Sequence, residues 1–130
     1  MDLLPRVSYS LRLYQEGERV MSTRSSIALI TEQGEIKSIY SHSDGYPSYM
    51  AELLKNNYAS TDKVEAILAE GDVSFLAETI EASRFYNSWR GENTQANVWS
   101  NFEMWENWAE SCGLQYIYLF NGSSWFWKEI

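Results

Sequence analysis

The stretch Tyr40-Ser41-His42-Ser43-Asp44-Gly45-Tyr46-Pro47-Ser48-Tyr49 marks the place where a strand pattern ends and a helix pattern begins. Asp44-Gly45 breaks the preceding strand. Pro47 suits the first turn of a helix, because the N–H that proline lacks would have no partner there. Apolar residues then follow at helical spacing, at Met50, Leu53 and Leu54. The stretch therefore predicts a strand-to-helix junction, with a helix that runs to about Asn57.

The same stretch contains the single histidine of the chain, His42. Ser41, His42 and Asp44 are the residue types of a hydrolytic triad. In an extended segment neighbouring side chains point to opposite faces, so Ser41 and His42 diverge while His42 and Asp44 share a face. A hydrolase that uses His42 and Asp44 as an acid–base pair is one alternative. We interpret His42, Asp44, Gly45 and Pro47 as structural residues of the junction, and we expect His42 and Asp44 to hydrogen-bond to each other.

The chain before this stretch predicts a β-hairpin. Apolar and β-branched residues run from Ser25 to Ile30, and a similar pattern runs from Ile36 to Tyr40. Gly34 between them supplies the positive φ of a turn. A second hairpin is predicted near the end of the sequence, where Asn121-Gly122 separates two aromatic-rich runs, Leu114–Phe120 and Ser124–Trp127.

Further helices are predicted between the two hairpins. Ser60 is a good N-cap and Gly71 a good C-terminal stop for the next helix. The segment from Asp72 to Ser83 predicts a short turn and a third helical segment. The polar run from Asn87 to Asn101 is the longest predicted loop, and Ser100 begins a capping box that opens the last helix.

This order of elements predicts an α+β fold, in which the N-terminal and C-terminal β-hairpins form one antiparallel sheet packed against three to four helices. We expect residues 21–130 to form a single domain. Residues 1–20 carry equal numbers of acidic and basic residues, and we interpret them as an extension upstream of the true start at Met21. The alternation from Val7 to Leu13 leaves an edge strand open as the other interpretation.

Composition limits the classes of partner. The chain of 130 residues has a formal net charge of −8, which repels phosphate backbones and anionic membranes. We therefore expect no direct nucleic-acid binding and no membrane association, and a basic protein surface is the favoured partner. Cys112 is the single cysteine, so the sequence predicts no disulfide and no thiolate-based zinc site, and a reducing cytoplasm is the expected setting. No His-rich or Cys-rich spacing predicts another metal site, and we expect no cofactor. A homo-oligomer remains open.

Two groups of residues are candidates for binding. Glu103, Glu106 and Glu110 share one side of the last predicted helix, which suits a basic partner, although a charged helix face is often only solvated. Trp89 and Arg90 lie in the long polar loop. Trp and Arg are common at binding hot spots, so this pair is a contact candidate or, alternatively, anchors the loop.

Several motifs resemble small uncharacterised proteins of tailed phages and prophages. They are Met21-Ser22-Thr23-Arg24-Ser25-Ser26-Ile27-Ala28, the Gly34 hairpin, Tyr40-x-His42-x-Asp44-Gly45-Tyr46-Pro47 and Gly71-Asp72-Val73-Ser74. The resemblance covers about residues 21 to 76 and the final hairpin. That family has Cys at the position of Ser41 and Trp at that of Ser43, and this departure argues against a cysteine-based mechanism or metal site.

The resemblance implies an accessory phage or prophage protein made in the bacterial cytoplasm. We expect a non-enzymatic protein that binds and inhibits a host factor, such as a defence protein, through the acidic helix and the Trp89 loop. One alternative is a binder of a small anionic, nucleotide-type ligand, with Arg84 or Arg90 neutralising phosphate. The hydrolase that uses His42 and Asp44 is the other.

Overall fold

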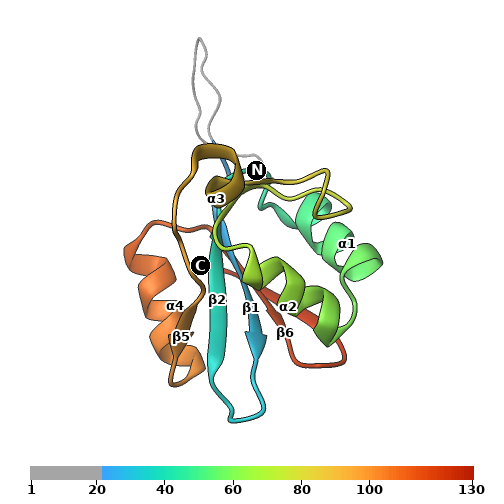
Figure 1. Ribbon diagram of the computed structural model, residues 1–130. Coiled ribbons are helices and arrows are strands. Elements are labelled where there is room, and N and C mark those ends of the chain that lie inside the picture. The colour runs from blue at the N-terminus through green and yellow to red at the C-terminus, as the bar shows by residue number, and fades with distance from the viewer. Residues whose placement is uncertain (1–21) are drawn as a thin grey trace.

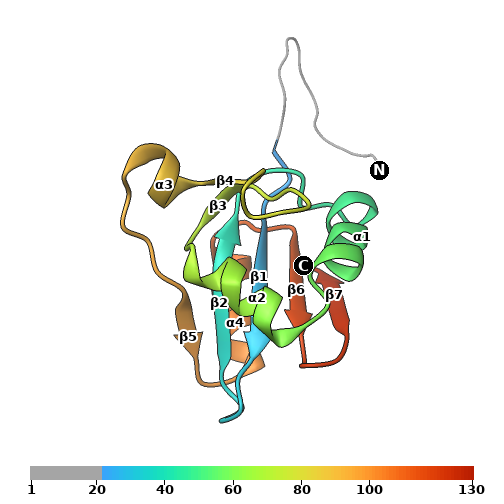
Figure 2. The ribbon, with the colours of Figure 1, turned by 45° about the vertical axis from the view of Figure 1, so that its right-hand side comes forward.

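The computed structural model describes residues 22–130, so the predictions for residues 1–20 lie outside it. Two helices, α1 (Pro47–Asn57) and α2 (Thr61–Ala69), cover one face of a sheet, and α4 (Phe102–Ser111) covers the other. Figure 1 shows the strands between these two helical layers, and in Figure 2 α2 lies in front of the sheet and α4 behind it. The short helix α3 (Tyr86–Arg90) lies at the upper end of the molecule in both views.

The sheet has seven strands in the order β4-β3-β2-β1-β6-β7, with β5 also paired to β2. The strands are β1 (Ser25–Ile30), β2 (Ile36–Ser41), β3 (Val73–Phe75), β4 (Arg84–Phe85), β5 (Asn97–Trp99), β6 (Tyr116–Phe120) and β7 (Trp125–Glu129). The predicted α+β class is confirmed, and both hairpins belong to one sheet. They join through β1 and β6, which run parallel with Ile27 opposite Tyr118. The sheet is therefore mixed, although most of its pairs are antiparallel.

The central strand β1 is buried on both faces, as expected for a strand between two helical layers. Ile27 and Leu29 belong to the core beneath α1 and α2, whereas Ala28 packs in the core beneath α4. Ser26 is a polar exception whose hydrogen bonds are satisfied. Its hydroxyl donates to the Ile39 carbonyl over 2.8 Å and accepts the indole N–H of Trp105 over 3.0 Å.

The two helices after the first hairpin form as predicted. Pro47 is the first residue of α1, which ends at Asn57. The hydroxyl of Ser60 caps α2 by accepting the backbone N–H of Lys63 over 3.3 Å. Gly71 follows this helix with φ +86°, a conformation that glycine adopts without steric cost.

The predicted third helix between Asp72 and Ser83 is wrong. Its beginning forms β3, whose Val73 pairs with Ser41 at the end of β2. The carbonyls of Leu76 and Ala77 then accept hydrogen bonds from the hydroxyls of Tyr49 and Tyr58, over 2.7 and 2.6 Å. Tertiary partners thus hold the backbone in a non-helical path, although the apolar spacing of this segment is helical.

The boundaries near the last helix also differ from the prediction. The N-cap is Asn101, whose side-chain oxygen accepts the N–H of Met104 over 2.9 Å, so the capping box at Ser100 is wrong by one residue. The predicted loop from Asn87 to Asn101 contains most of α3 and all of β5. Cys112 is exposed at the C-terminal end of α4.

Candidate functional site

The junction between β2 and α1 is built around Gly45. A Cβ atom on this residue would lie 2.5 Å from the hydroxyl oxygen of Ser25 and 2.9 Å from the carbonyl oxygen of Thr23. The Gly45 N–H donates to that same Thr23 carbonyl over 2.9 Å, and the Gly45 carbonyl accepts the hydroxyl of Tyr118 over 2.6 Å. Asp44 precedes it with φ +56°, a conformation that Asp tolerates in turns. The segment therefore needs glycine for close approach and joins three strands.

His42 lies beside Tyr40 and not beside Asp44. Its Nδ1 is 2.6 Å from the Tyr40 hydroxyl oxygen, and the two residues share a face because they are two apart in an extended segment. Burial raises the pKa of the Tyr40 hydroxyl, and the guanidinium of Arg24 opposes this shift. The expected hydrogen bond between His42 and Asp44 is wrong, and among the described residues no carboxylate hydrogen-bonds to the imidazole. His42 and Asp44 therefore lack the direct hydrogen bond that an acid–base pair needs.

The hydroxyl of Ser41 forms no hydrogen bond with His42, whose Nδ1 lies beside Tyr40. Ser41 and its cross-strand partner Ser25 are fully buried. Neither hydroxyl has a hydrogen-bond partner within residues 22–130. A nucleophile at Ser41 would have no base and no access to substrate.

The first candidate binding surface is the α3 cluster, which we define as Arg84, Tyr86, Trp89 and Arg90. The indole of Trp89 is 50 % exposed. The guanidinium carbons of Arg84 and Arg90 lie 4.6 and 4.9 Å from the centre of this ring. Arg90 also lies 4.8 Å from the ring centre of Tyr86. Cation–π contacts of this length bring two positive charges to one exposed aromatic surface in an acidic protein.

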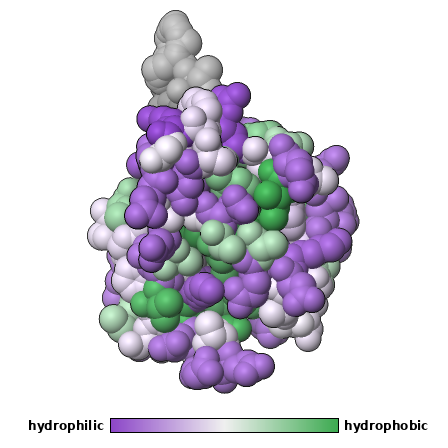
Figure 3. All heavy atoms as spheres, in the orientation of Figure 1, coloured by the Kyte–Doolittle hydropathy of each residue, from purple (hydrophilic) through white to green (hydrophobic). Residues whose placement is uncertain are grey.

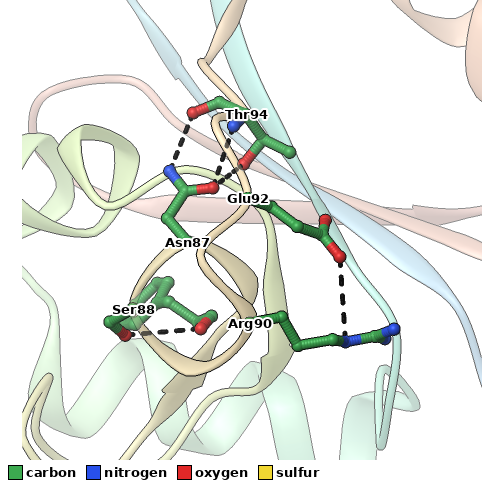
Figure 4. A network of polar contacts seen from close by, with 6 residues as sticks. Asn87, Ser88, Arg90, Glu92 and Thr94 are labelled. Carbon is green, nitrogen blue, oxygen red and sulfur yellow. Dashed lines mark hydrogen bonds and ion pairs between the residues drawn. The ribbon is translucent and has the colours of Figure 1, made fainter.

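Asn87 fixes the α3 cluster to the rest of the molecule (Figure 4). Its side-chain oxygen accepts the N–H and the hydroxyl of Thr94, each over 2.8 Å. Its NH₂ group donates to the carbonyls of Glu70 and Thr94 over 3.1 and 2.9 Å. Figure 4 also shows Glu92 bending toward Arg90, at 3.7 Å between charged atoms. Trp89 and Arg90, which the sequence placed in a loop, thus lie on an anchored helix.

The second candidate surface is the α4–β7 surface, which we define as Phe102, Glu103, Glu106, Glu110, Phe126 and Lys128. Glu106 hydrogen-bonds to the ammonium group of Lys128 on β7, so this side of α4 faces the last strand. Glu103 and Glu110 lie three and four residues from Glu106 and share its side of the helix. Both are exposed and, within residues 22–130, neither forms an ion pair. Phe102 precedes Glu103 in α4, and Phe126 lies on the same face of β7 as Lys128; both rings are exposed.

The sequence reasoning missed the exposed aromatic residues of β7. It placed this strand correctly in the final hairpin but did not show that β7 ends the described sheet. Phe126 is 56 % exposed and Trp127 50 % exposed. The charged pair Lys128-Glu129 at the end of the strand is a signal of partial solvent exposure that was available in the sequence.

The predicted binding residues fall into two separate surfaces. Trp89 and Arg90 belong to α3 at the upper end of the molecule, whereas Glu103, Glu106 and Glu110 belong to α4 lower down (Figures 1 and 2). The face seen in Figure 3 is mostly hydrophilic, and its apolar residues appear as small groups rather than one large patch. A single interface that includes both predicted sets would have to extend around the molecule.

The described part of the chain offers few signs of other chemistry. Within residues 22–130 no group of three or more His, Cys, Asp or Glu residues is arranged to hold a metal ion. In the same range no helix has the length and apolar character needed to cross a bilayer. Comparison of the chain with protein-family models, curated proteins and solved structures found no match.

Proposed function

We propose that this protein is a non-enzymatic binding module that recognises a partner protein with a basic surface through the α4–β7 surface. One observation carries the proposal. Glu103 and Glu110 are exposed carboxylates without an ion pair among the described residues, on the helix that contacts β7 through Glu106 and Lys128, and Phe102 of this helix and Phe126 of β7 are exposed as well. Protein interfaces combine an apolar, often aromatic, centre with a polar rim in this way.

Charge supports the same assignment. The net charge of −8 attracts a basic partner over long range and speeds its association at low salt. Glu106 is already neutralised by Lys128, so Glu103 and Glu110 remain for cations of the partner. A partner with Lys or Arg around an apolar contact would complement this surface.

The biological setting of the proposal rests on the resemblance to phage and prophage proteins. In that setting the protein is an accessory factor that binds a bacterial host protein and inhibits it, with components of host defence as the favoured targets. The binding chemistry proposed for the α4–β7 surface does not depend on this setting.

The test is a paired charge reversal. The variant Glu103→Lys/Glu110→Lys is compared with Glu32→Lys/Glu35→Lys, which makes the same change of charge in the exposed turn between β1 and β2. Proteins captured from a bacterial lysate at low salt are purified, and their affinities are measured by calorimetry. We expect the α4 variant to bind the partner at least about tenfold more weakly, and the turn variant to bind like the unchanged protein. Equal binding by both variants would overturn the proposal.

A second candidate function has support from the α3 cluster. Two guanidinium groups beside one exposed indole suit a small anionic ligand whose aromatic ring stacks on Trp89. The test is a thermal-shift measurement with mono-, di- and cyclic nucleotides. A shift that disappears in Arg84→Gln/Arg90→Gln supports this function, and no shift with any nucleotide removes it. The hydrolase alternative has less support, because His42 bonds to Tyr40.

A further inference from the structure

We infer that the outer edge of β7, which ends the sheet within residues 22–130, accepts an extended basic segment of the partner as an additional strand of the sheet. The inference rests on the proposed function, because it specifies how the α4–β7 surface recognises its partner. It names a docking mode, a sequence pattern in the partner and the backbone groups that make the contacts.

The hydrogen-bond pattern of the last hairpin identifies those backbone groups. The Ile130 N–H donates to the Gln115 carbonyl over 3.0 Å, and the Asn121 N–H donates to the Ser124 carbonyl over 3.1 Å. In an antiparallel pair, residues alternate between those that bond to the neighbouring strand and those that point away from it. Because Ile130 bonds toward β6, this alternation means that the backbone groups of Lys128 and Phe126 also form hydrogen bonds with β6. The N–H and C=O groups of Trp125, Trp127 and Glu129 therefore point outward.

The edge of β7 lacks several of the features that protect natural sheet edges, although α1 contacts this strand on one face, where the Trp125 indole donates to the Tyr58 carbonyl over 2.8 Å. Among the described strands, β7 ends the sheet on this side, and in Figure 2 it is the right-hand strand of the sheet, below α1. It contains no proline and a single cation, Lys128, which is occupied by Glu106. Phe126 and Trp127 are half exposed on opposite faces of the strand. An exposed aromatic edge of this kind is a template for another strand.

The position of α4 determines which sequence fits. A strand added about 4.8 Å beyond β7 places every second side chain on the α4 face. The contact between Lys128 and Glu106 shows that the acidic side of α4 faces β7, so Lys or Arg side chains on the added strand reach Glu103 and Glu110. On the other face the added side chains meet Trp127. The matching segment alternates basic and apolar residues.

A second copy of the chain fits this edge less well. Each copy carries a net charge of −8, so association is opposed by like-charge repulsion. Pairing of β7 with its own copy would also bring two acidic α4 helices toward the same edge. The complementary charge of a basic segment favours the partner strand instead.

The experiment removes one outward donor without changing a side chain. Cys112 is exposed and is the single cysteine, so a synthetic segment of residues 112–130 can be ligated to residues 1–111 to give the full chain. We compare the unmodified ligated protein with one that carries an N-methyl group on Trp127. Circular dichroism checks that both fold. The probes are short fluorescein-labelled peptides that alternate Lys or Arg with Val, Ile or Tyr, and binding is measured by fluorescence anisotropy.

We expect the alternating peptides to bind the unmodified protein and N-methylation of Trp127 to weaken binding at least about tenfold. Glu103→Lys/Glu110→Lys weakens binding similarly, whereas Glu32→Lys/Glu35→Lys does not. Peptides of the same composition with the basic residues grouped at one end bind more weakly. Absence of peptide binding, or equal binding by the N-methylated protein, would overturn the inference.

Two further outcomes separate this inference from the proposed function. One outcome is that a captured partner no longer binds Glu103→Lys/Glu110→Lys but keeps its affinity for the N-methylated protein. This result would contradict strand addition and support the acidic interface. If neither change affects binding of the partner, both strand addition and the proposed acidic interface are contradicted. Sedimentation of the protein alone that shows a dimer, abolished by N-methylation, would overturn strand addition by a partner in favour of a second copy.

Discussion

The hydroxyl of Tyr118 donates a 2.6 Å hydrogen bond to the carbonyl oxygen of Gly45, 73 residues earlier in the chain. This bond connects β6 of the last hairpin to the junction at which β2 of the first hairpin turns into α1. The same glycine contacts the chain just before β1 through Thr23. The segment from Tyr40 to Tyr49 thus connects the two hairpins, which gives it a structural role.

Replacement of Gly45 with alanine should destabilise the fold. The added methyl group would lie 2.5 Å from the Ser25 hydroxyl oxygen and 2.9 Å from the backbone oxygen of Thr23, and overpacking of this kind costs about 1–3 kcal/mol. We expect Gly45→Ala to lower the free energy of unfolding by that amount in urea denaturation. Ser48→Ala, at an exposed position of α1, is the control and should change stability by less than about 0.5 kcal/mol. Equal values for the two variants would contradict the prediction.

Tyr118 should make the protein sensitive to alkali. Burial raises the pKa of its hydroxyl above the ordinary value. A group with a raised pKa in the folded state contributes stability that is complete below its unfolded pKa, about 10 for tyrosine, and is lost as pH rises further. We expect the free energy of unfolding to fall with increasing pH above about 10, and to fall less steeply in Tyr118→Phe. In Tyr118→Phe the free energy of unfolding still falls with pH, because burial also raises the pKa of Tyr58.

At neutral pH the same Tyr118→Phe variant leaves the buried Gly45 carbonyl without its donor, which costs about 1–3 kcal/mol. Phenylalanine retains the ring and its packing, so the loss reports the hydrogen bond. Urea denaturation at neutral and alkaline pH measures both effects. A variant with the stability of the unchanged protein at neutral pH, or with the same slope above pH 10, would contradict this assignment.

The sequence predicted the elements whose signals are local. Pro47 and Ser60 begin their helices as expected, and both hairpins form. The segment after Gly71 was predicted wrongly because its strand depends on a distant partner, Ser41, for pairing. The parallel junction between β1 and β6 likewise has no local signal, because a period of two identifies a strand but not the direction of its neighbour.

The candidate site was predicted in part. Trp89 is exposed as its polar surroundings indicated, but the helix that carries it depends on contacts between Asn87 and Thr94, which no short-range pattern shows. The side of α4 that carries Glu106 followed from helical spacing. Its closeness to Lys128 arises only when β7 takes its place in the sheet, so the joint surface was not visible in the sequence.

Asp72 should make the stability of the folded protein depend on pH in the acid range, in a direction that its pKa shift determines. Burial raises the pKa of this carboxyl, the hydrogen bond from the Tyr40 N–H opposes the shift, and Glu92 adds to it. A raised pKa means that the folded state favours the protonated form, so the contribution to stability is complete below the unfolded pKa of about 3.9 and is lost as pH rises through the folded pKa.

Asn can accept the Tyr40 N–H as Asp72 does over 3.0 Å, but it carries no charge. We therefore expect Asp72→Asn to gain stability relative to the unchanged protein as pH rises from about 3 to 7. Urea denaturation at several pH values in this range measures the difference. A difference that is constant, or that moves in the opposite direction, would show that burial of the carboxyl does not control its protonation.

Asn87 should control the stability of the α3 cluster. Asn87→Asp preserves the shape of the side chain but replaces its NH₂ group, which donates to the Glu70 and Thr94 carbonyls, with an oxygen that repels them. The loss of these hydrogen bonds, together with the unpaired charge, should lower the free energy of unfolding by at least about 1–3 kcal/mol. It should also speed hydrogen exchange of the Thr94 amide. Asn93→Asp makes the same chemical change at an exposed position of the same loop and should have little effect. Since α3 is held by this anchor, hydrogen exchange of its backbone amides should also become faster in the Asn87 variant alone, and equal exchange in both variants would show that α3 is held by other contacts.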